Sequence, residues 1–398
     1  MKKITFNDFV IIVAIMLFPI TVFPQLPEGS YILVSDITAN VTPTSDYKIL
    51  KFDNNGENGE LFTDVELSWP QDILIAEIPN EGHRVLVSNL FSGKITKYDL
   101  DGNYVGDFAT GIGGPTRMHI RNNELYVLQW FNQSAPEFVL RYSLDGTPLG
   151  NFTDTGTTLS IGLDWDSDGN FYLSSYGSPP FNGNPAIPAQ IYRYNSQGEF
   201  ESVFISETDL AGPTNIWFDK SGSGDLWVID YNSNSVKRFD SEGNLIGTII
   251  TGLSTPEGVA FLENGNFLIG NGITGLIKMY DSNGTFIEDF IDAQASMEAN
   301  LINTNAFYIT SATLSLTEVT KKEIPFLFPT IGNKFTFDAN IVNANDSIIF
   351  NDLSGRQLKH IKLDNSMEWI PNNYNDGIYF ISVISGEKKI TQKIIIKN

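Results

Sequence analysis

Apolar and polar residues alternate in short extended segments that recur throughout residues 27–322. Six of these segments end in an aromatic residue, and a turn containing glycine follows each one. Glycine and the Asn-Gly and Asp-Gly pairs tolerate the positive φ of tight hairpin turns. The recurrence therefore predicts repeated hairpins. The aromatic residues are Phe52, Tyr98, Tyr142, Tyr194, Phe239 and Tyr280, at intervals of 41 to 52 residues.

Three further short strands fit between successive aromatic markers, as at 104–108, 216–218 and 225–229. Four short strands in a unit of about 45 residues are typical of a β-propeller blade. No stretch in this region has the 3.6-residue period of a long helix. The pattern predicts an all-β fold, a β-propeller followed by a small β-sandwich.

The number of blades is predicted as six, with seven as the alternative. In the six-bladed arrangement, strands at 31–36 and 47–52 pair with a strand near 297–302. Residues 307–310 are then not assigned to any strand of the six blades, and an incomplete seventh blade would include them. The phrases Pro256-Glu257-Gly258-Val259-Ala260 and Asp168-Gly169-Asn170-Phe171 resemble NHL-type propeller repeats, which implies the fold more than any activity.

The two ends of the chain differ from the repeats. Residues 1–25 begin with Lys2 and Lys3 and continue into an apolar run, which predicts an export signal peptide; a membrane anchor is the alternative. No later segment approaches the roughly 18 apolar residues needed to cross a bilayer, so no transmembrane segment is expected in the mature chain. The predicted domains are the signal at 1–25, the propeller at 26–322 and a separate unit at 323–398.

The last unit resembles the type A C-terminal sorting domain of the type IX secretion system. The resemblance rests on Phe328-Pro329, on the run from Asp352 to Leu358, on Asp376-Gly377-Ile378-Tyr379-Phe380, and on the closing segment 389–398. The usual Pro-Asn-Pro opening is replaced by Phe328-Pro329-Thr330. The resemblance implies passage across the outer membrane by the type IX machinery and a secreted or surface-attached product. An accessory β-sandwich is the alternative.

The charge and the cysteine content of the chain limit the kinds of partner and metal site that are expected. The formal net charge is −22, yet residues 323–398 hold eight basic and eight acidic residues, so the acidity lies in the repeats. Nucleic-acid binding needs a basic face, and nucleic acid is therefore not expected as a partner. The chain has no cysteine, which excludes disulfides and thiolate metal sites.

The candidate site lies at the mouth of the central channel, where the loops that enter the innermost strands converge. Alignment of the repeats places one polar residue of each blade there, with three polar neighbours. A ring of such groups suits a cation or a small polar ligand, although polar residues are also expected wherever a channel is wet. The candidates are Gln71, Asp72, Thr116, Arg117, Ser160, Thr214, Asn215, Glu257 and Glu298.

Two sets of residues are candidate calcium ligands: one at the channel mouth and one in a loop rich in aspartate. The context of Glu257 resembles the metal-binding glutamate of gluconolactonase-like propellers, and Asn215 would be the asparagine of that set, but no aspartate can be placed. Asp164, Asp166 and Asp168 have a spacing that can wrap around a calcium ion. A turn between two blade strands is the alternative for these aspartates.

Two functions remain open at this stage. The first is a binding or scaffold propeller for an extracellular glycan, peptide or protein, and aromatic residues at 126, 130, 131 and 176 would stack on sugars. The second is a calcium-dependent lactone hydrolase, or a lyase, working at the channel. The missing third metal ligand and the lack of a placed general base favour the first.

Overall fold

The computed structural model describes residues 26–130, 137–180, 185–219, 222–310, 326–339, 341–343, 346–351, 357–362, 366–371, 374–385 and 388–397. The predicted signal peptide, Phe131 and most of the run 352–358 lie outside these residues. The chain divides into two compact units, Met1–Leu316 and Thr317–Asn398. The predicted boundary after residue 322 falls six residues later, also outside the described part. Each unit is described by itself below.

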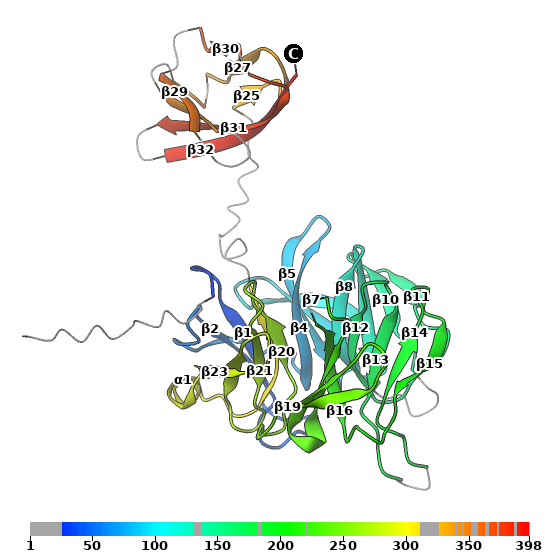
Figure 1. Ribbon diagram of the computed structural model, residues 1–398. Helices are drawn as coiled ribbons and strands as arrows, with labels where there is room; N and C mark the ends of the chain where they lie inside the picture. Colours follow the sequence, from blue (N-terminus) through cyan, green and yellow to red (C-terminus); the bar gives the residue numbers. More distant parts are fainter. Residues whose placement is uncertain are drawn as a thin grey trace, which may run out of the picture. The chain divides into compact units, whose positions relative to one another are not determined.

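Six antiparallel four-stranded sheets form the first unit in its described residues. The innermost strands of neighbouring sheets lie side by side, which gives a six-bladed propeller (Figure 1). The predicted all-β fold, a propeller with a small second β unit, is therefore confirmed. The blades, each written from its innermost to its outermost strand, are β24 (Thr304–Ile309), β1 (Ile32–Asp36), β2 (Lys48–Phe52), β3 (Glu60–Thr63); β4 (Pro70–Ile78), β5 (Gly82–Asn89), β6 (Lys94–Tyr98), β7 (Tyr104–Thr110); β8 (Pro115–Arg121), β9 (Glu124–Gln129), β10 (Leu140–Ser143), β11 (Pro148–Asn151); β12 (Ser160–Trp165), β13 (Phe171–Ser175), β14 (Gln190–Tyr194), β15 (Phe200–Ile205); β16 (Pro213–Phe218), β17 (Leu226–Asp230), β18 (Ser235–Phe239), β19 (Leu245–Ile250); and β20 (Val259–Phe261), β21 (Phe267–Gly270), β22 (Ile277–Tyr280), β23 (Phe286–Ile291).

The ring closes within the first blade, where the late strand β24 pairs antiparallel with the early strand β1. Figure 1 shows the blue strand β1 beside the yellow-green strands β20 and β21 for this reason. The predicted closing strand at 297–302 is wrong, because this stretch begins in helix α1 (Ala293–Ala299). The Asp292 side chain accepts hydrogen bonds from the first turn of α1, and Asn300 ends it in the left-handed conformation. Residues 307–309 belong to β24, so no seventh blade is needed.

The inner strands of the sheets, such as β1 and β17, are buried on both faces because each sheet packs against two neighbours. In β1, Ile32 and Val34 contact the sixth blade, while Leu33 between them contacts the second. Such alternation follows from the two-residue period of a strand. The six marker aromatics lie at or next to the ends of the third strands and are at most 6% exposed. Burial between blades, rather than in one central core, therefore holds this unit together.

The glycine after each marker meets two requirements. Gly102, for example, has φ +86°, and a Cβ placed on it would lie 2.0 Å from the carbonyl oxygen of Phe62 in the preceding blade. A side chain there would be strained and would push the blades apart. The predicted positive φ is confirmed at all six positions, at 77–86°.

The second unit contains two sheets around a core that includes Phe335, Phe350, Trp369 and Ile381. Strands β31 (Gly377–Ser385) and β32 (Lys388–Ile396) pair over nine residues, and β26 (Ile331–Gly332) pairs with β32 in parallel. The three-stranded sheet is β25 (Leu327–Phe328), β27 (Phe335–Phe337) and β30 (Glu368–Trp369); the five-stranded sheet is β26 (Ile331–Gly332), β32 (Lys388–Ile396), β31 (Gly377–Ser385), β28 (Ser347–Asn351) and β29 (Gln357–Lys362).

Candidate functional site at the channel mouth

Every blade begins its innermost strand and ends its second strand at the same end of the channel. Strand pairing therefore fixes which residues are equivalent: Pro70 opposes Asn89 in one blade, as Pro213 opposes Asp230 in another. The residue after each such position faces the channel mouth, and these residues are called the mouth ring here. The mouth ring is Gln71, Thr116, Ile161, Thr214, Glu257 and Asn305, all at most 8% exposed.

Six residues were predicted at the mouth, one for each blade. Four of them lie in this ring, and Ser160 and Glu298 do not. Ser160 opposes Ser175 and so occupies the position before the ring, because no proline marks this blade's entry. Its hydroxyl lies 2.6 Å from the Thr157 hydroxyl, away from the ring contacts. Glu298 lies on helix α1, where it accepts a hydrogen bond from Gln294 at the surface. Asn305 takes the sixth position.

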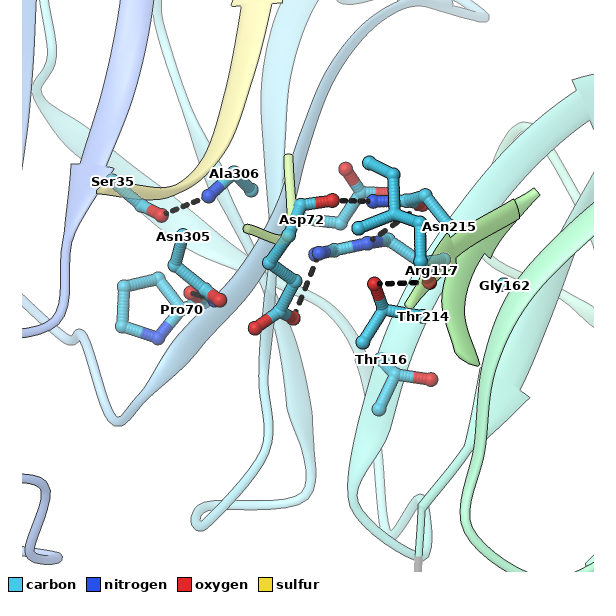
Figure 2. A network of polar contacts seen from close by, with 12 residues as sticks. Ser35, Pro70, Asp72, Thr116, Arg117, Gly162, Thr214, Asn215, Asn305 and Ala306 are labelled. Atoms are coloured by element: carbon cyan, nitrogen blue, oxygen red, sulfur yellow. Dashed lines mark hydrogen bonds and ion pairs between the residues drawn. The ribbon is translucent and has the colours of Figure 1, made fainter. Parts of the chain in front are cut away.

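A polar network fills the channel just below the ring (Figure 2). The Arg117 guanidinium donates to the Glu257 carboxylate through Nη2 at 2.8 Å and to Asn215 Oδ1 through Nε at 3.2 Å. The amide of Asn215 in turn donates to the backbone carbonyl of Glu257. Three separate blades, the third, fifth and sixth, are thus joined across the channel. Arg117 and Glu257 are 140 residues apart in the sequence.

Asp72 lies beside this network and connects two blades. Its Oδ2 accepts from the Met118 backbone N–H at 2.7 Å, and its Oδ1 accepts from the Ile73 N–H at 2.9 Å. Burial raises the pKa of the Asp72 carboxyl to about 6, against the opposing effect of the Arg117 charge. Burial also raises the pKa of Glu257, again against Arg117. Two carboxylates therefore share one guanidinium.

Two further residues complete the contacts of the ring. With its amide nitrogen directed at Glu257 (3.3 Å), Gln71 accepts from Trp69 Nε1 at 2.6 Å and from Asn305 Nδ2 at 3.2 Å. Asn305 also donates to the Pro70 carbonyl at 2.9 Å. Arg117 Nη1 and Asn305 Oδ1 are two of the eight buried side-chain atoms that have no hydrogen-bond partner within the described residues. Unsatisfied buried polar atoms are rare in proteins, and here both lie in the channel.

The network separates two pockets. The mouth pocket, of about 170 Å³, has Gln71, Thr214 and Glu257 in its lining together with apolar and aromatic side chains. The far pocket, of about 340 Å³, lies farther along the inner strands and includes Asp72, Arg117 and Asn215. The apolar lining of the mouth pocket consists of Trp69, Leu90, Trp130, Ile161, Tyr176 and Tyr231; that of the far pocket includes Trp217, Phe261 and Tyr308, with His119 beside them.

Among the aromatic residues predicted to stack on sugars, Trp130 and Tyr176 line the mouth pocket. Tyr126 is instead buried between the third and fourth blades. Trp69 and Tyr231 were not predicted. Tyr231 could have been found, because it follows the end of the second strand as Trp130 and Tyr176 do in their blades.

A second set of buried polar residues was also missed, one at the end of each second strand. Each side chain hydrogen-bonds the backbone of the loop that leads into the inner strand of its own blade. Asn89 Oδ1 accepts from Ser68 N at 2.8 Å, and Asn271 Oδ1 accepts from Ser254 N at 2.8 Å. These residues, called the cap ring here, hold the mouth loops in place. The cap ring is Asp36, Asn89, Gln129, Ser175, Asp230 and Asn271.

The candidate metal ligands Glu257 and Asn215 already accept hydrogen bonds from a side chain of the protein. Glu257 Oε1 and Asn215 Oδ1 both accept from Arg117, and a guanidinium so close would repel a calcium ion. The donor set therefore does not fit a metal of the gluconolactonase-like kind. No group of three or more His, Cys, Asp or Glu side chains arranged to hold a metal occurs in the described residues.

The three aspartates of the second calcium candidate do not point to a common centre. Asp164 Oδ2 accepts from the Phe218 N–H of the next blade at 2.8 Å. Asp166 accepts from the N–H groups of Asp168 and Asn170, which is an Asx-type turn. Asp99 and Asp240 make the same turn in other blades. The arrangement supports the turn interpretation.

Residues 330–397 match the family described as the secretion system C-terminal sorting domain. No curated protein matches the sequence. Within the described part of the chain, no helix is both long and apolar enough to span a bilayer.

Among solved structures, the chain is similar to one from the nidogen/laminin complex, with 14% identity and a TM-score of 0.53, over 71% of this chain and 99% of that one. It is also similar to virginiamycin B lyase from Staphylococcus aureus (15% identity, TM-score 0.39, 55% of this chain and 68% of that one) and to a streptogramin B lyase (14%, 0.40, 59% and 73%). Identities this low bear on the fold alone. The NHL-type resemblance stays a prediction. The sorting domain implies secretion to the outer surface or the medium, and the chain is a β-propeller protein with a C-terminal sorting domain of the type IX secretion system.

Proposed function

We propose that the propeller is an extracellular binding module whose ligand inserts a small group into the mouth pocket. The observation that carries this proposal is the pocket itself: four aromatic side chains, from four successive blades, around a carboxylate and an amide. Aromatic walls with a few fixed polar groups are typical of small-ligand sites. Export by the sorting domain would place this pocket where glycans, peptides and surface proteins are the available ligands.

The metal-dependent hydrolase is disfavoured by the Arg117 contacts. A lactonase of this kind needs a cation to polarise the substrate carbonyl, and it needs a base to generate the nucleophile. In the channel the guanidinium occupies the place next to Glu257 and Asn215. The far pocket is larger, but its two aspartates accept hydrogen bonds from backbone N–H groups of neighbouring blades.

The test is a binding screen of the full chain against glycan and peptide panels, followed by thermal unfolding with each hit. A ligand that binds only the folded state raises the unfolding midpoint. We expect Trp130→Ala to abolish the rise. Phe261→Ala, which removes an aromatic ring from the far pocket, is the matched control and should retain it. Lactone hydrolysis that EDTA abolishes and calcium restores would overturn the proposal.

A further inference from the structure

We propose that the mouth pocket is an aromatic cage for the quaternary ammonium group of a small molecule. This inference rests on the proposed function and adds the chemical class of the ligand. Its basis is the combination of ring geometry, hydrogen-bond satisfaction and charge in the pocket lining.

The rings form walls rather than one flat platform. Trp130, Tyr176 and Tyr231 occupy equivalent positions in three successive blades, each directly after a cap-ring residue. The centroids of Trp130 and Tyr176 are 5.5 Å apart with the planes at 53°, and those of Tyr176 and Tyr231 are 6.0 Å apart at 66°. A sugar ring stacks on one aromatic face, whereas a tetrahedral cation gains from several faces at once.

The polar edges of two of the four rings, Tyr176 and Trp69, are already satisfied within the protein. The Tyr176 hydroxyl donates to Asn232 Oδ1 at 2.9 Å, and Trp69 Nε1 donates to Gln71. The Thr214 hydroxyl donates to the carbonyl of Ile229. The pocket therefore offers aromatic faces and few spare donors, which suits a group that makes no hydrogen bonds. A hydroxylated sugar would leave its own polar groups unpaired there.

The charge of the pocket favours a cation. Its lining contains the carboxylate of Glu257 and no lysine or arginine. Below it, Arg117 supplies one positive charge against the two carboxylates of Glu257 and Asp72, so the network is negative overall when both are ionised. The Glu257 charge reaches the rings: it contributes to raising the pKa values of Tyr176 and Tyr231, although burial is the larger cause.

The volume limits the ligand to a head group. At about 170 Å³, the mouth pocket is smaller than the roughly 300–1,000 Å³ of sites that enclose a drug-sized ligand. A compact trimethylammonium group fits this description, with the rest of the molecule extending to solvent.

The test compares choline with its uncharged isostere 3,3-dimethylbutan-1-ol by isothermal titration calorimetry on the full chain, at constant ionic strength. The two differ only in the charged nitrogen, so a hydrophobic pocket would bind both. We expect choline to bind about five- to thirtyfold more tightly, as a cation–π contribution of one to two kcal/mol implies. Equal binding of the two compounds would overturn the inference.

Variants of one residue give an independent test. Tyr176→Phe keeps the ring and should change choline affinity by less than about threefold, whereas Tyr176→Leu should weaken it about tenfold. The isostere comparison needs no variant, so it decides the question even if Tyr176→Leu does not fold. If neither compound binds, yet a hit from the glycan and peptide panels is lost in Trp130→Ala, the ammonium inference fails and the binding module stands. If no ligand depends on Trp130, both fail.

Discussion

The cap ring and the mouth ring each have one buried member per blade, all polar except Ile161 of the mouth ring, and their bonding differs. Every cap-ring side chain bonds the backbone of its own blade and the loop just before it. Mouth-ring residues such as Glu257 and Asn305 instead bond residues of other blades. Two of the eight buried side-chain atoms without a hydrogen-bond partner in the described residues, Arg117 Nη1 and Asn305 Oδ1, lie in or next to the mouth ring, and none belongs to the cap ring.

This difference separates structural polar residues from candidate functional ones. A polar group satisfied by local backbone stabilises the fold, and the structure requires nothing further of it. Other polar groups are held by side chains from distant parts of the chain and leave atoms without hydrogen bonds in the channel. Burying such atoms costs free energy, and the stability of the fold does not explain why they are retained. Substitutions in the two rings should therefore give different phenotypes.

The largest effect is expected in the cap ring at Asp230. This fully buried carboxylate accepts from the N–H groups of Ala211 and Gly212 and from Lys237 Nζ at 2.6 Å. Asp230→Ala would leave the lysine without its ion-pair partner and two N–H groups unsatisfied, and should lower the free energy of unfolding of the propeller by about 3–5 kcal/mol. Denaturant unfolding followed by tryptophan fluorescence measures this loss.

The same experiment checks that the cap ring is structural. Any Asp230→Ala protein that remains folded should still bind mouth-pocket ligands, with a smaller loss of affinity than in Trp130→Ala. A folded variant with normal stability but lost binding would erase the distinction between the two rings.

The next effect is expected below the mouth ring at Arg117. Arg117→Met leaves Glu257 buried without its counter-ion and should cost about 3 kcal/mol at pH 8. Burial already raises the pKa of Glu257 in the folded state, and loss of Arg117 raises it further. The folded state then binds the proton more tightly than the unfolded state, so stability falls as pH rises and the loss should be smaller at pH 5.

The control for Arg117 is the double variant Arg117→Met, Glu257→Gln, in which no buried charge is left uncompensated at the pair. It should recover part of the stability at pH 8, and the pH dependence that remains should come from Asp72, whose carboxyl also loses the opposing Arg117 charge. Equal losses at pH 5 and pH 8 in the single variant would show that the ion pair is not the reason for the effect.

The smallest effect is expected in the turns, outside both rings. Asp166→Ala removes the side-chain acceptor of one turn and should cost about 1 kcal/mol, with or without calcium. Asp240→Ala, in a turn of the same type between the third and fourth strands of another blade, is the control and should behave alike. A loss for Asp166 that appears only in calcium, and not for Asp240, would restore the calcium-loop interpretation.

Much of the fold could be predicted because its signals are local. The marker aromatics, the glycine turns and the two-residue alternation lie within segments of a few residues, and each repeats six times. The sorting domain was recognised in the same way, from short motifs near its beginning and end, and the family match to residues 330–397 confirms it.

The site was predicted only where the local pattern was regular. Gln71, Thr116, Thr214 and Glu257 lie in the mouth ring as expected, and Pro70, Pro115, Pro213 and Pro256 stand directly before them. Ser160 was displaced by one residue because its blade lacks that proline. Glu298 was chosen because the closing strand was assigned to a segment whose cap residues make it helical.

The sequence by itself determined the repeat, the blade architecture and the export route, since each depends on neighbours along the chain. Only the tertiary structure decided that Asn305 completes the ring, that Arg117 neutralises Glu257, and that three aromatic residues after the second strands surround one pocket. These contacts form when the ring closes between β1 and β24. Closure brings together side chains more than a hundred residues apart, and no local pattern records which residue will lie opposite which.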